Sequence, residues 1–191
     1  MIRHLAFPAL LALAAAVGVR AQSIQVDASI PYAFHGWDTA GYSVDAGSCF
    51  ADHHFLGLEW IHFNPTPINV LPVVGALRVS EKVEALQLAY RFTYPIYRPL
   101  EFYLGAAAGI GRVQEALPNS PSVSSAVGPV LSAGNTEWCG ELAAGLQFDI
   151  GPHFAIKGGY RYLDSFNNIK QFGAATNTDT KTLEIGVVAK F

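Results

Sequence analysis

One short stretch of this sequence carries the groups that metal chemistry uses. Asp52, His53 and His54 stand side by side and offer one carboxylate and two imidazoles. A zinc site usually requires three or four ligands in a defined geometry, and nothing in the sequence supplies the rest of such a set. We therefore interpret these residues as the polar part of a turn, and we expect no metal and no cofactor.

Cys49 and Cys139 are the two cysteines of the chain and the second candidate for chemistry. An oxidising compartment would favour a disulfide bond between them. The bond also requires Cα atoms within about 7 Å of each other. Its formation therefore depends on the elements that hold the two residues.

The first residues have the pattern of an export signal. Residues 1–4 include Arg3, residues 5–19 are apolar, and Val19-Arg20-Ala21 offers small residues around a cleavage point. This order is typical of a secretory signal peptide. We expect residues 1–21 to be cleaved and residues 22–191 to form one domain. A membrane anchor is the alternative, but the apolar run is short and ends at a cleavable site.

The composition limits the remaining choices. Charged residues make up 14% of the 191 residues, against about 25% in an average protein. The net charge of -3 comes without any basic run, so we expect no nucleic acid partner. After Ala21 no apolar run approaches the roughly 20 residues of a membrane-spanning helix, which leaves a closed barrel as the way to cross a membrane.

Apolar and polar residues alternate along most of the remaining chain. Residues 24–35, for example, place Ile24, Val26 and Ile30 on one face and Gln25, Asp27 and Ser29 on the other. Such alternation predicts a strand with one apolar face. Similar segments cover residues 42–50, 55–63, 85–94, 102–111, 138–150, 154–162 and 182–191. About eight strands of roughly ten residues follow, the length that a tilted strand needs to cross a bilayer.

The predicted connections alternate between short and long. Short turns cover residues 51–53, 95–99 and 151–153; long connections cover 64–81, 114–136 and 165–179, and 35–39 is the shortest link on that side. Outer-membrane barrels place short turns in the periplasm and long loops outside, with an even number of strands. We predict an all-β fold, an eight-stranded antiparallel up-and-down transmembrane β-barrel. Cys49 and Cys139 then lie near opposite ends, so we expect no disulfide bond.

The direction of the apolar face distinguishes a membrane barrel from a soluble one. A soluble barrel points its apolar face inward, and a membrane barrel points it towards lipid. Small residues on the polar face suit a narrow lumen, and aromatic residues near strand ends resemble the girdles of membrane barrels. The small residues are Gly105, Ala107, Gly109, Gly145, Gly159 and Gly186. A secreted soluble barrel or sandwich is the alternative.

The last strand makes the resemblance more specific. Leu183, Ile185, Val187 and Ala189 alternate up to the final Phe191. This pattern resembles the C-terminal signature of bacterial outer-membrane proteins, and residues 22–191 as a whole resemble the OmpA-type small outer-membrane barrel superfamily. The resemblance implies contact with outer-membrane lipid. It also implies periplasmic chaperones and the barrel-assembly machinery as partners, with Leu183, Ile185, Val187 and Phe191 as the assembly signal.

If the apolar face meets lipid, the charged side chains point into the lumen, where unpaired charges are costly. They are Asp27, Asp45, Glu59, Arg91, Glu141, Asp149, Lys157, Arg161, Glu184 and Lys190. We predict a structural network of Glu59, Arg91, Glu141, Lys157, Arg161 and Glu184, with Arg161 between Glu141 and Glu184. An eight-stranded barrel is just wide enough to be filled by side chains, so we expect a plugged polar core. A small pore is the alternative.

Residues 160–168 raise the question of enzymatic activity. They are similar to the strand end that carries the active site of lipid A deacylases, where a His, one further residue, a Ser and an Asn occur. This chain has Asp164 and Phe166 in the places of the His and the Ser, and Ser165 is one residue early. Without base and nucleophile no hydroxyl is activated for ester attack. We expect a non-enzymatic scaffold that presents its loops, with a lipid A-modifying enzyme as the alternative. The long connections carry no residue cluster that identifies an extracellular ligand.

Overall fold

The structure, a computed structural model, describes residues 23–35, 39–51, 53–64, 68–70, 77–116, 132–165, 169–171, 174–176 and 180–191. The expected signal peptide, residues 1–21, lies outside these ranges. None of the described residues forms a helix long and apolar enough to cross a membrane.

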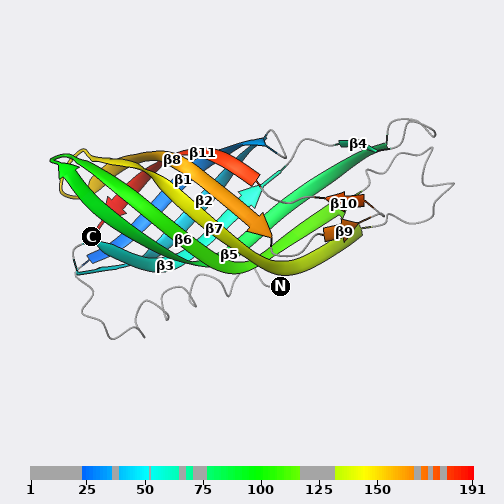
Figure 1. Cartoon of the computed structure of the whole chain (residues 1–191), viewed down its shortest axis with the longest axis horizontal. Helices are drawn as coiled ribbons and strands as arrows, with labels where there is room; N and C mark the ends of the chain where they lie inside the picture. Colours follow the sequence, from blue (N-terminus) through cyan, green and yellow to red (C-terminus); the bar gives the residue numbers. More distant parts are fainter. Residues whose placement is uncertain are drawn as a thin grey trace.

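Eight long strands form the wall of the molecule (Figure 1). They are β1 (Ser23–His35), β2 (Thr39–Phe50), β3 (His54–Phe63), β5 (Leu77–Tyr97), β6 (Leu100–Ala116), β7 (Ser132–Asp149), β8 (Phe154–Ser165) and β11 (Thr180–Lys190). Three short strands, β4 (Ile68–Val70), β9 (Ile169–Gln171) and β10 (Ala174–Thr176), lie within two of the predicted long connections.

Antiparallel pairing closes these strands into a barrel. Their order is β3-β2-β1-β11-β8-β7-β6-β5, and β3 also pairs with β5. Each strand therefore pairs with its neighbours in sequence, and β1 and β11 join the two ends of the series. The predicted eight-stranded antiparallel up-and-down barrel is confirmed. Closure leaves every barrel strand paired on both sides, as a lipid environment requires.

Several predicted boundaries were wrong. β5 begins at Leu77 inside the connection predicted over 64–81, and β6 and β7 extend to Ala116 and from Ser132, inside the connection predicted over 114–136. These three strands remain paired with one another beyond the ends of β3 and β8 (Figure 1). At the other end, β5 continues to Tyr97 inside the turn predicted over 95–99. Ladder hydrogen bonds join backbones and do not require alternating side chains, so alternation underestimates strand length.

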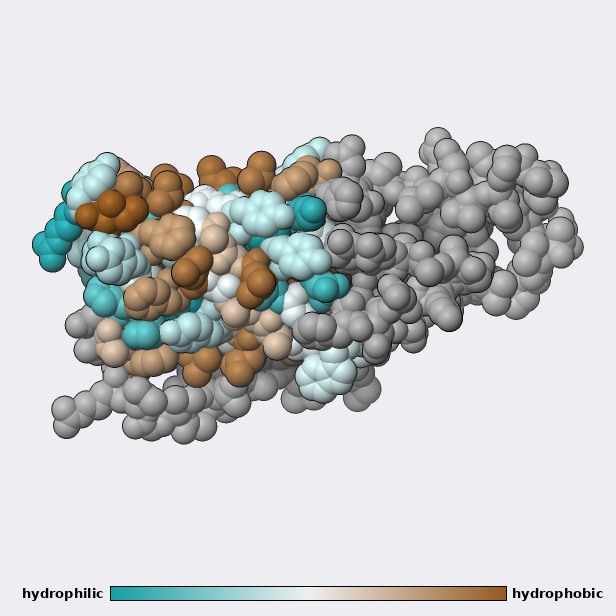
Figure 2. Space-filling model, in the orientation of Figure 1, coloured by the Kyte–Doolittle hydropathy of each residue, from teal (hydrophilic) through white to brown (hydrophobic). Residues whose placement is uncertain are grey.

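The outward and inward faces of the strands differ in chemistry. On β11, Leu183, Ile185 and Val187 are more than half exposed, whereas the neighbouring Thr182 and Glu184 are buried. The other strands repeat this alternation. Figure 2 shows the resulting hydrophobic side chains spread over the described part of the wall. The apolar face therefore points outward, the reverse of a soluble barrel.

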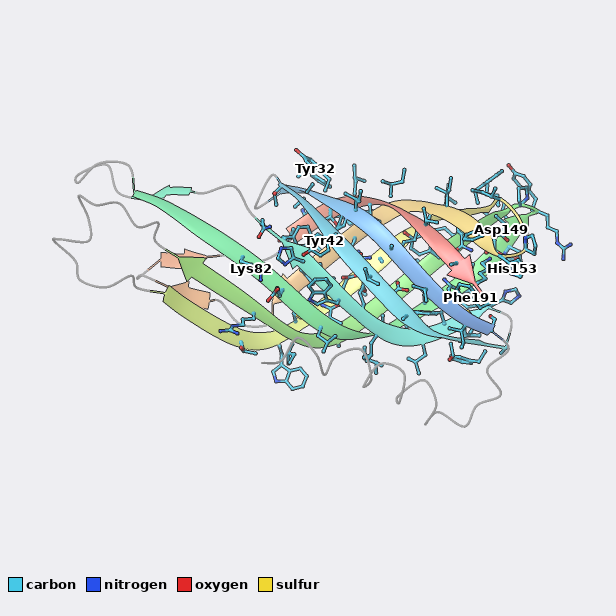
Figure 3. The ribbon with its side chains drawn as sticks, turned by 180° about the vertical axis from the view of Figure 1, so that it is seen from behind. Tyr32, Tyr42, Lys82, Asp149, His153 and Phe191 are labelled. Atoms are coloured by element: carbon cyan, nitrogen blue, oxygen red, sulfur yellow. The ribbon has the colours of Figure 1, made fainter. Side chains whose placement is uncertain are left out.

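The two ends of the barrel are distinct, and we name them by how the strands are joined. At the turn end, short turns join β2 to β3, β5 to β6 and β7 to β8. Phe191 lies there beside the start of β1, because its backbone N–H donates to Ile24 O at 2.8 Å. At the connection end, the chain joins β1 to β2, β3 to β5, β6 to β7 and β8 to β11. Figure 3 shows Phe191, His153 and Asp149 at the turn end, with Tyr32, Tyr42 and Lys82 towards the other.

Candidate functional site: the charged lumen

Charged side chains fill the middle of the barrel. Each projects from the inward face of its strand, opposite the apolar side chains, because successive strand residues point to opposite faces. All are 1–6% exposed. They are Asp27 on β1, Asp45 on β2, Glu59 on β3, Arg91 on β5, Glu141 on β7, Lys157 and Arg161 on β8, and Glu184 on β11.

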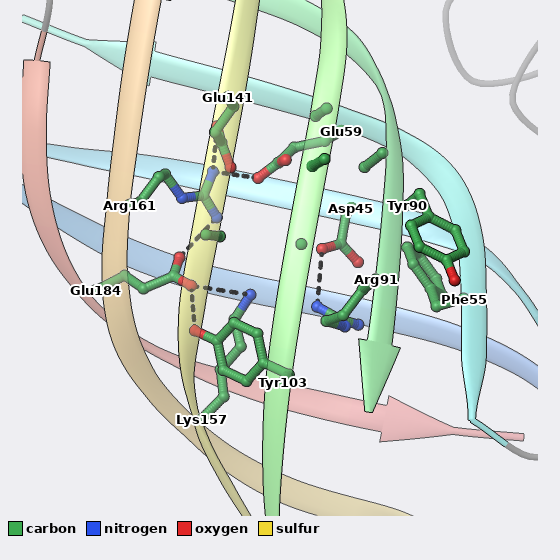
Figure 4. Close-up of a pocket in the computed structure, with 15 residues that line it drawn as sticks. Asp45, Phe55, Glu59, Tyr90, Arg91, Tyr103, Glu141, Lys157, Arg161 and Glu184 are labelled. Carbon is green, nitrogen blue, oxygen red and sulfur yellow. Dashed lines mark hydrogen bonds and ion pairs between the residues drawn. The ribbon is translucent and has the colours of Figure 1, made fainter. Parts of the chain in front are cut away.

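Arg161 contacts three carboxylates at once (Figure 4). Its Nη1 donates to Glu59 Oε1 and, at 3.1 Å, to Glu141 Oε2, and its Nη2 donates to Glu184 Oε2 at 2.6 Å. Two of these carboxylates come from the neighbouring strands, one diagonal away in register, and Glu59 comes from β3 across the barrel. The planar guanidinium has donors in several directions, which suits it to this junction.

Lys157 and Arg91 extend the network towards the turn end. Lys157 Nζ lies 2.6 Å from Asp27 Oδ2 and 3.6 Å from Glu184 Oε1. Arg91 Nη1 lies 2.9 Å from the same Asp27 oxygen and 3.5 Å from Asp45 Oδ2. Asp27 and Glu184 therefore link the three cations into one continuous network. Each buried charge is paired, which offsets the desolvation cost of burying it.

Among the described residues, Tyr103 on β6 is the largest side chain buried to less than 2% exposure, and it supports this network. Its hydroxyl donates to Glu184 Oε1 at 2.7 Å, and Ser29 Oγ donates to Glu184 Oε2 at 3.1 Å. The Arg91 guanidinium also stacks on Phe55, with its Cζ 4.7 Å from the ring centroid. Glu184 thus has hydroxyl as well as cationic partners, as a buried carboxylate requires.

A second polar layer lies at the turn end of the lumen. Lys190 Nζ lies 2.8 Å from Asp149 Oδ1 and 3.9 Å from Glu101 Oε2. The amide of Gln147 donates to the same Glu101 oxygen at 2.9 Å. The side chains of these ion pairs are about a quarter exposed, so this layer is wetter than the central network.

The central network leaves little free space. The cavity beside it has a volume of about 30 Å³ and is bordered by Asp45, Glu59, Arg91, Tyr103 and Arg161, among others (Figure 4). That volume holds one or two water molecules. The charged groups of the lining are already engaged with one another, so the site is suited to holding the wall together.

Sequence comparison agrees with this architecture. The outer membrane protein beta-barrel domain family matches residues 6–191, nearly the whole chain. The chain belongs to this family. No curated protein matches the sequence significantly.

Several small outer-membrane barrels of known structure are similar to this member of the outer membrane protein beta-barrel domain family. Neisserial surface protein A has a TM-score of 0.62 at 18% identity, covering 88% of this chain and 96% of its own. A major outer membrane protein from Thermus thermophilus has a TM-score of 0.58 at 11% identity, covering 88% and 99%. The N-terminal β-barrel domain of Pseudomonas aeruginosa OprF has a TM-score of 0.52 at 16% identity, covering 90% and 98%. At these identities the likeness shows the fold alone.

The structure also places the other residues that the sequence singles out. Among the described residues of this family member, no group of three or more His, Cys, Asp or Glu side chains could hold a metal ion. Asp52 lies outside the described residues, and His54 faces outward with its Nδ1 2.6 Å from the Tyr90 hydroxyl. Cys49 and Cys139 are free thiols. Of the deacylase-like stretch, Phe166 to Asn168 lie outside the described residues.

Sequence reasoning missed Tyr103 as part of the site. The structure gathers the six predicted network residues around Arg161, Lys157 and Arg91, and it adds Asp27, Asp45 and Tyr103 to them. A signal for Tyr103 was present in the sequence, because it is the one aromatic residue among the small residues Gly105, Ala107 and Gly109 on its face.

Proposed function

We propose that this protein is a non-enzymatic scaffold of the bacterial outer membrane, a barrel plugged by its own side chains that presents the chain segments at the connection end. The observation that carries the proposal is the contact of Arg161 with three carboxylates from three strands. Such a junction ties opposite walls together across the lumen. A permanent pore would require these buried ion pairs to separate, which is costly.

The proposed route to the outer membrane begins with export. Residues 1–21 act as the export signal and are cleaved. Periplasmic chaperones and the barrel-assembly machinery then bind the unfolded chain. The machinery recognises the assembly signal formed by Leu183, Ile185, Val187 and Phe191. The outward direction of Leu183, Ile185 and Val187 on the strand that closes the barrel supports this role.

The proposal assigns no catalytic role to any residue. In the deacylase-like stretch, Asp164 stands in the place of the histidine, and no serine follows two residues later. The stretch therefore lacks the base–nucleophile pair of an esterase. The lumen supplies no alternative, since its charged groups are paired with one another and leave a cavity of about 30 Å³.

Three measurements test the proposal. The folded protein should fractionate with outer membranes and migrate faster on a gel before heating than after it; recovery as a soluble periplasmic protein would contradict the location. In planar bilayers it should give no steady single-channel conductance, and a steady conductance would support a small pore instead. Incubation with lipid A should release no fatty acid, and a released fatty acid would support an enzyme.

A further inference from the structure

The central network of the lumen holds more acidic groups than cationic groups. All of its charged side chains are 1–6% exposed. The acidic ones are Asp27, Asp45, Glu59, Glu141 and Glu184, and the cationic ones are Arg91, Lys157 and Arg161. If every one of these groups were ionised, the network would carry a net charge of -2. Burial of uncompensated charge is costly, so the network requires additional positive charge.

No other described side chain in the lumen supplies this charge. At the turn end, Lys190 Nζ already lies 2.8 Å from Asp149 Oδ1 and 3.9 Å from Glu101 Oε2. The imidazole of His62 packs against the Tyr42 ring on the outer face of the wall. Towards the connection end, the next inward layer is apolar and 0–5% exposed, with Ile61, Phe63, Val83 and Leu163 among its members. Water therefore reaches the network from the turn end.

Three of the acidic side chains stand directly beside one another. Asp27 on β1 pairs with Asp45 on β2, and Asp45 pairs with Glu59 on β3. Directly paired residues of antiparallel strands project from the same face with Cβ atoms about 4.5–5.5 Å apart, and like charges at this spacing repel. Because carboxyl groups that share a buried site do not all ionise, this row favours a bound proton.

Asp45 has the weakest ionic partner in this row. Asp27 Oδ2 lies 2.6 Å from Lys157 Nζ and 2.9 Å from Arg91 Nη1, whereas Asp45 Oδ2 lies 3.5 Å from the same Arg91 nitrogen. The Asp45 side chain is 6% exposed, and its Oδ1 makes no hydrogen bond to the described residues. Asp45 borders the cavity of about 30 Å³, which has room for a water molecule as its partner (Figure 4). An un-ionised carboxyl group fits this position.

Glu59 and Glu141 form a second crowded pair. Both accept hydrogen bonds from Arg161 Nη1, whereas Glu184 accepts from Nη2. Glu184 also accepts from the Tyr103 hydroxyl at 2.7 Å, so it has the donors that an ionised carboxylate requires. Glu59 and Glu141 instead share one nitrogen. A single proton between these two carboxyl groups would remove the remaining excess of negative charge.

We propose that the lumen is a proton-binding site. At about pH 6, where free Asp and Glu side chains are ionised, Asp45 holds one proton and Glu59 and Glu141 share a second. The central network is then neutral, with the other carboxylates ionised beside the three cations. Protons fit better than a metal ion, because the described residues include no group of three or more His, Cys, Asp or Glu side chains that could hold one. The inference goes beyond the scaffold role and rests on its plugged lumen.

The pH dependence of unfolding counts the bound protons. For each proton that the folded state holds beyond the unfolded chain, the unfolding equilibrium constant rises about tenfold per pH unit. Urea titrations of the full chain in lipid vesicles, between about pH 5.5 and 6.5, measure this rise above the range in which free Asp and Glu titrate. We expect the rise to be about tenfold smaller in Asp45→Asn and in Glu141→Gln than in the original chain. Asp149→Asn is the matched control, because it makes the same change in the wetter layer at the turn end, and it should keep the original rise.

A second comparison assigns one proton to Asp45. Asparagine resembles an un-ionised aspartic acid, so Asp45→Asn should stay close to the original stability at about pH 6. Asp27→Asn removes the oxygen that Lys157 and Arg91 share, so it should unfold at a lower urea concentration at every pH. Infrared spectra of the folded original chain should also show the carbonyl band of an un-ionised carboxyl group, and this band should weaken in Asp45→Asn.

Each outcome decides the proposal. A variant that keeps the original pH dependence would overturn the assignment to its carboxyl group, and an equal change in Asp149→Asn would indicate net charge alone and overturn the site. A difference seen in choline chloride but absent in sodium chloride would show a small cation in place of the protons. Equal loss of stability in Asp45→Asn and Asp27→Asn would contradict the proton on Asp45. If Asp45→Asn does not fold, Glu141→Gln and the infrared band still decide. An open pore would appear as steady conductance in planar bilayers and leave the proton count readable.

Discussion

The hydroxyl of Tyr103 donates a 2.7 Å hydrogen bond to Glu184 at the centre of the barrel, and two glycines make room for it. A Cβ atom at Gly159 would lie 2.2 Å from this hydroxyl oxygen, and one at Gly145 would lie 2.6 Å from it. The two glycines face each other on β8 and β7. They allow the tyrosine to reach the carboxylate that Arg161 and Lys157 share.

We expect Gly159→Ala to destabilise the barrel by about 1–3 kcal/mol, the usual cost of overpacking a filled interior. The new methyl group would meet both the Tyr103 hydroxyl and, at 2.6 Å, the backbone oxygen of Ala144, which cannot move without shifting β7. Urea titration of the protein in lipid vesicles, followed by heat-modifiable gel migration, measures the free energy of unfolding. Gly158→Ala is the control, because its added Cβ would come no closer than 3.7 Å to another residue. Equal stability of the two variants would count against a close contact at Tyr103.

Arg161→Met tests the lumen network. The change leaves Glu59, Glu141 and Glu184 without their shared guanidinium, and we expect a loss of about 3–5 kcal/mol, as when one partner of a buried ion pair is removed. The same urea titration measures it, and Lys181→Met on the outer face should have a small effect. Unchanged stability of Arg161→Met would contradict the structural role of the network.

The sequence was sufficient to predict the fold because every strand of a lipid-facing barrel must point apolar side chains outward and polar or small side chains inward. Alternation identifies each strand, as on β11, where exposed Ile185 lies between buried Glu184 and buried Gly186. The extra length of β5, β6 and β7 could not be found this way, because residues such as Leu77 and Ala116 are held by backbone ladders that no side-chain pattern records.

The site was predictable only in part. The alternation predicts that Arg161 points inward, and counting from the turn predicted at residues 151–153 places it one diagonal from Glu141. Its contact with Glu59 crosses the lumen from β3 and depends on the tilt and closure of the whole barrel. Asp27 contacts both Arg91 on β5 and Lys157 on β8. Because β5 and β8 are not adjacent, this shared contact also depends on the closure of the whole barrel.

Leu88→Arg tests the direction of the apolar face. Leu88 is 48% exposed on β5, between the charged Glu84 and the aromatic Tyr94. An arginine facing lipid near the bilayer centre costs about 2–4 kcal/mol, whereas one near the interface costs about 0–1 kcal/mol. We expect Leu88→Arg to fall in the first range and Tyr94→Arg, on the same face near the turn end, in the second. Folding titrations in vesicles measure both. Near-neutral effects of both changes would indicate a face that meets water.

The two thiols should behave as separate and unequal groups. Cys139 is 4% exposed and accepts a hydrogen bond from the Gln87 amide at 3.2 Å, whereas Cys49 is only partly buried and donates to Gln25 Oε1 at 3.1 Å. Because reagents attack an accessible thiol first, we expect maleimide to label Cys49 before Cys139 in the folded barrel and both equally in urea. Mass spectrometry of the labelled peptides measures the order, with Cys49→Ser and Cys139→Ser identifying each site.

The two thiols should also stay unbridged when an oxidant is added. Cys49 lies at the turn end, whereas Cys139 pairs with Ser165 near the connection end, so the two sulfur atoms are held apart. A bridged monomer on a non-reducing gel would contradict this strand register.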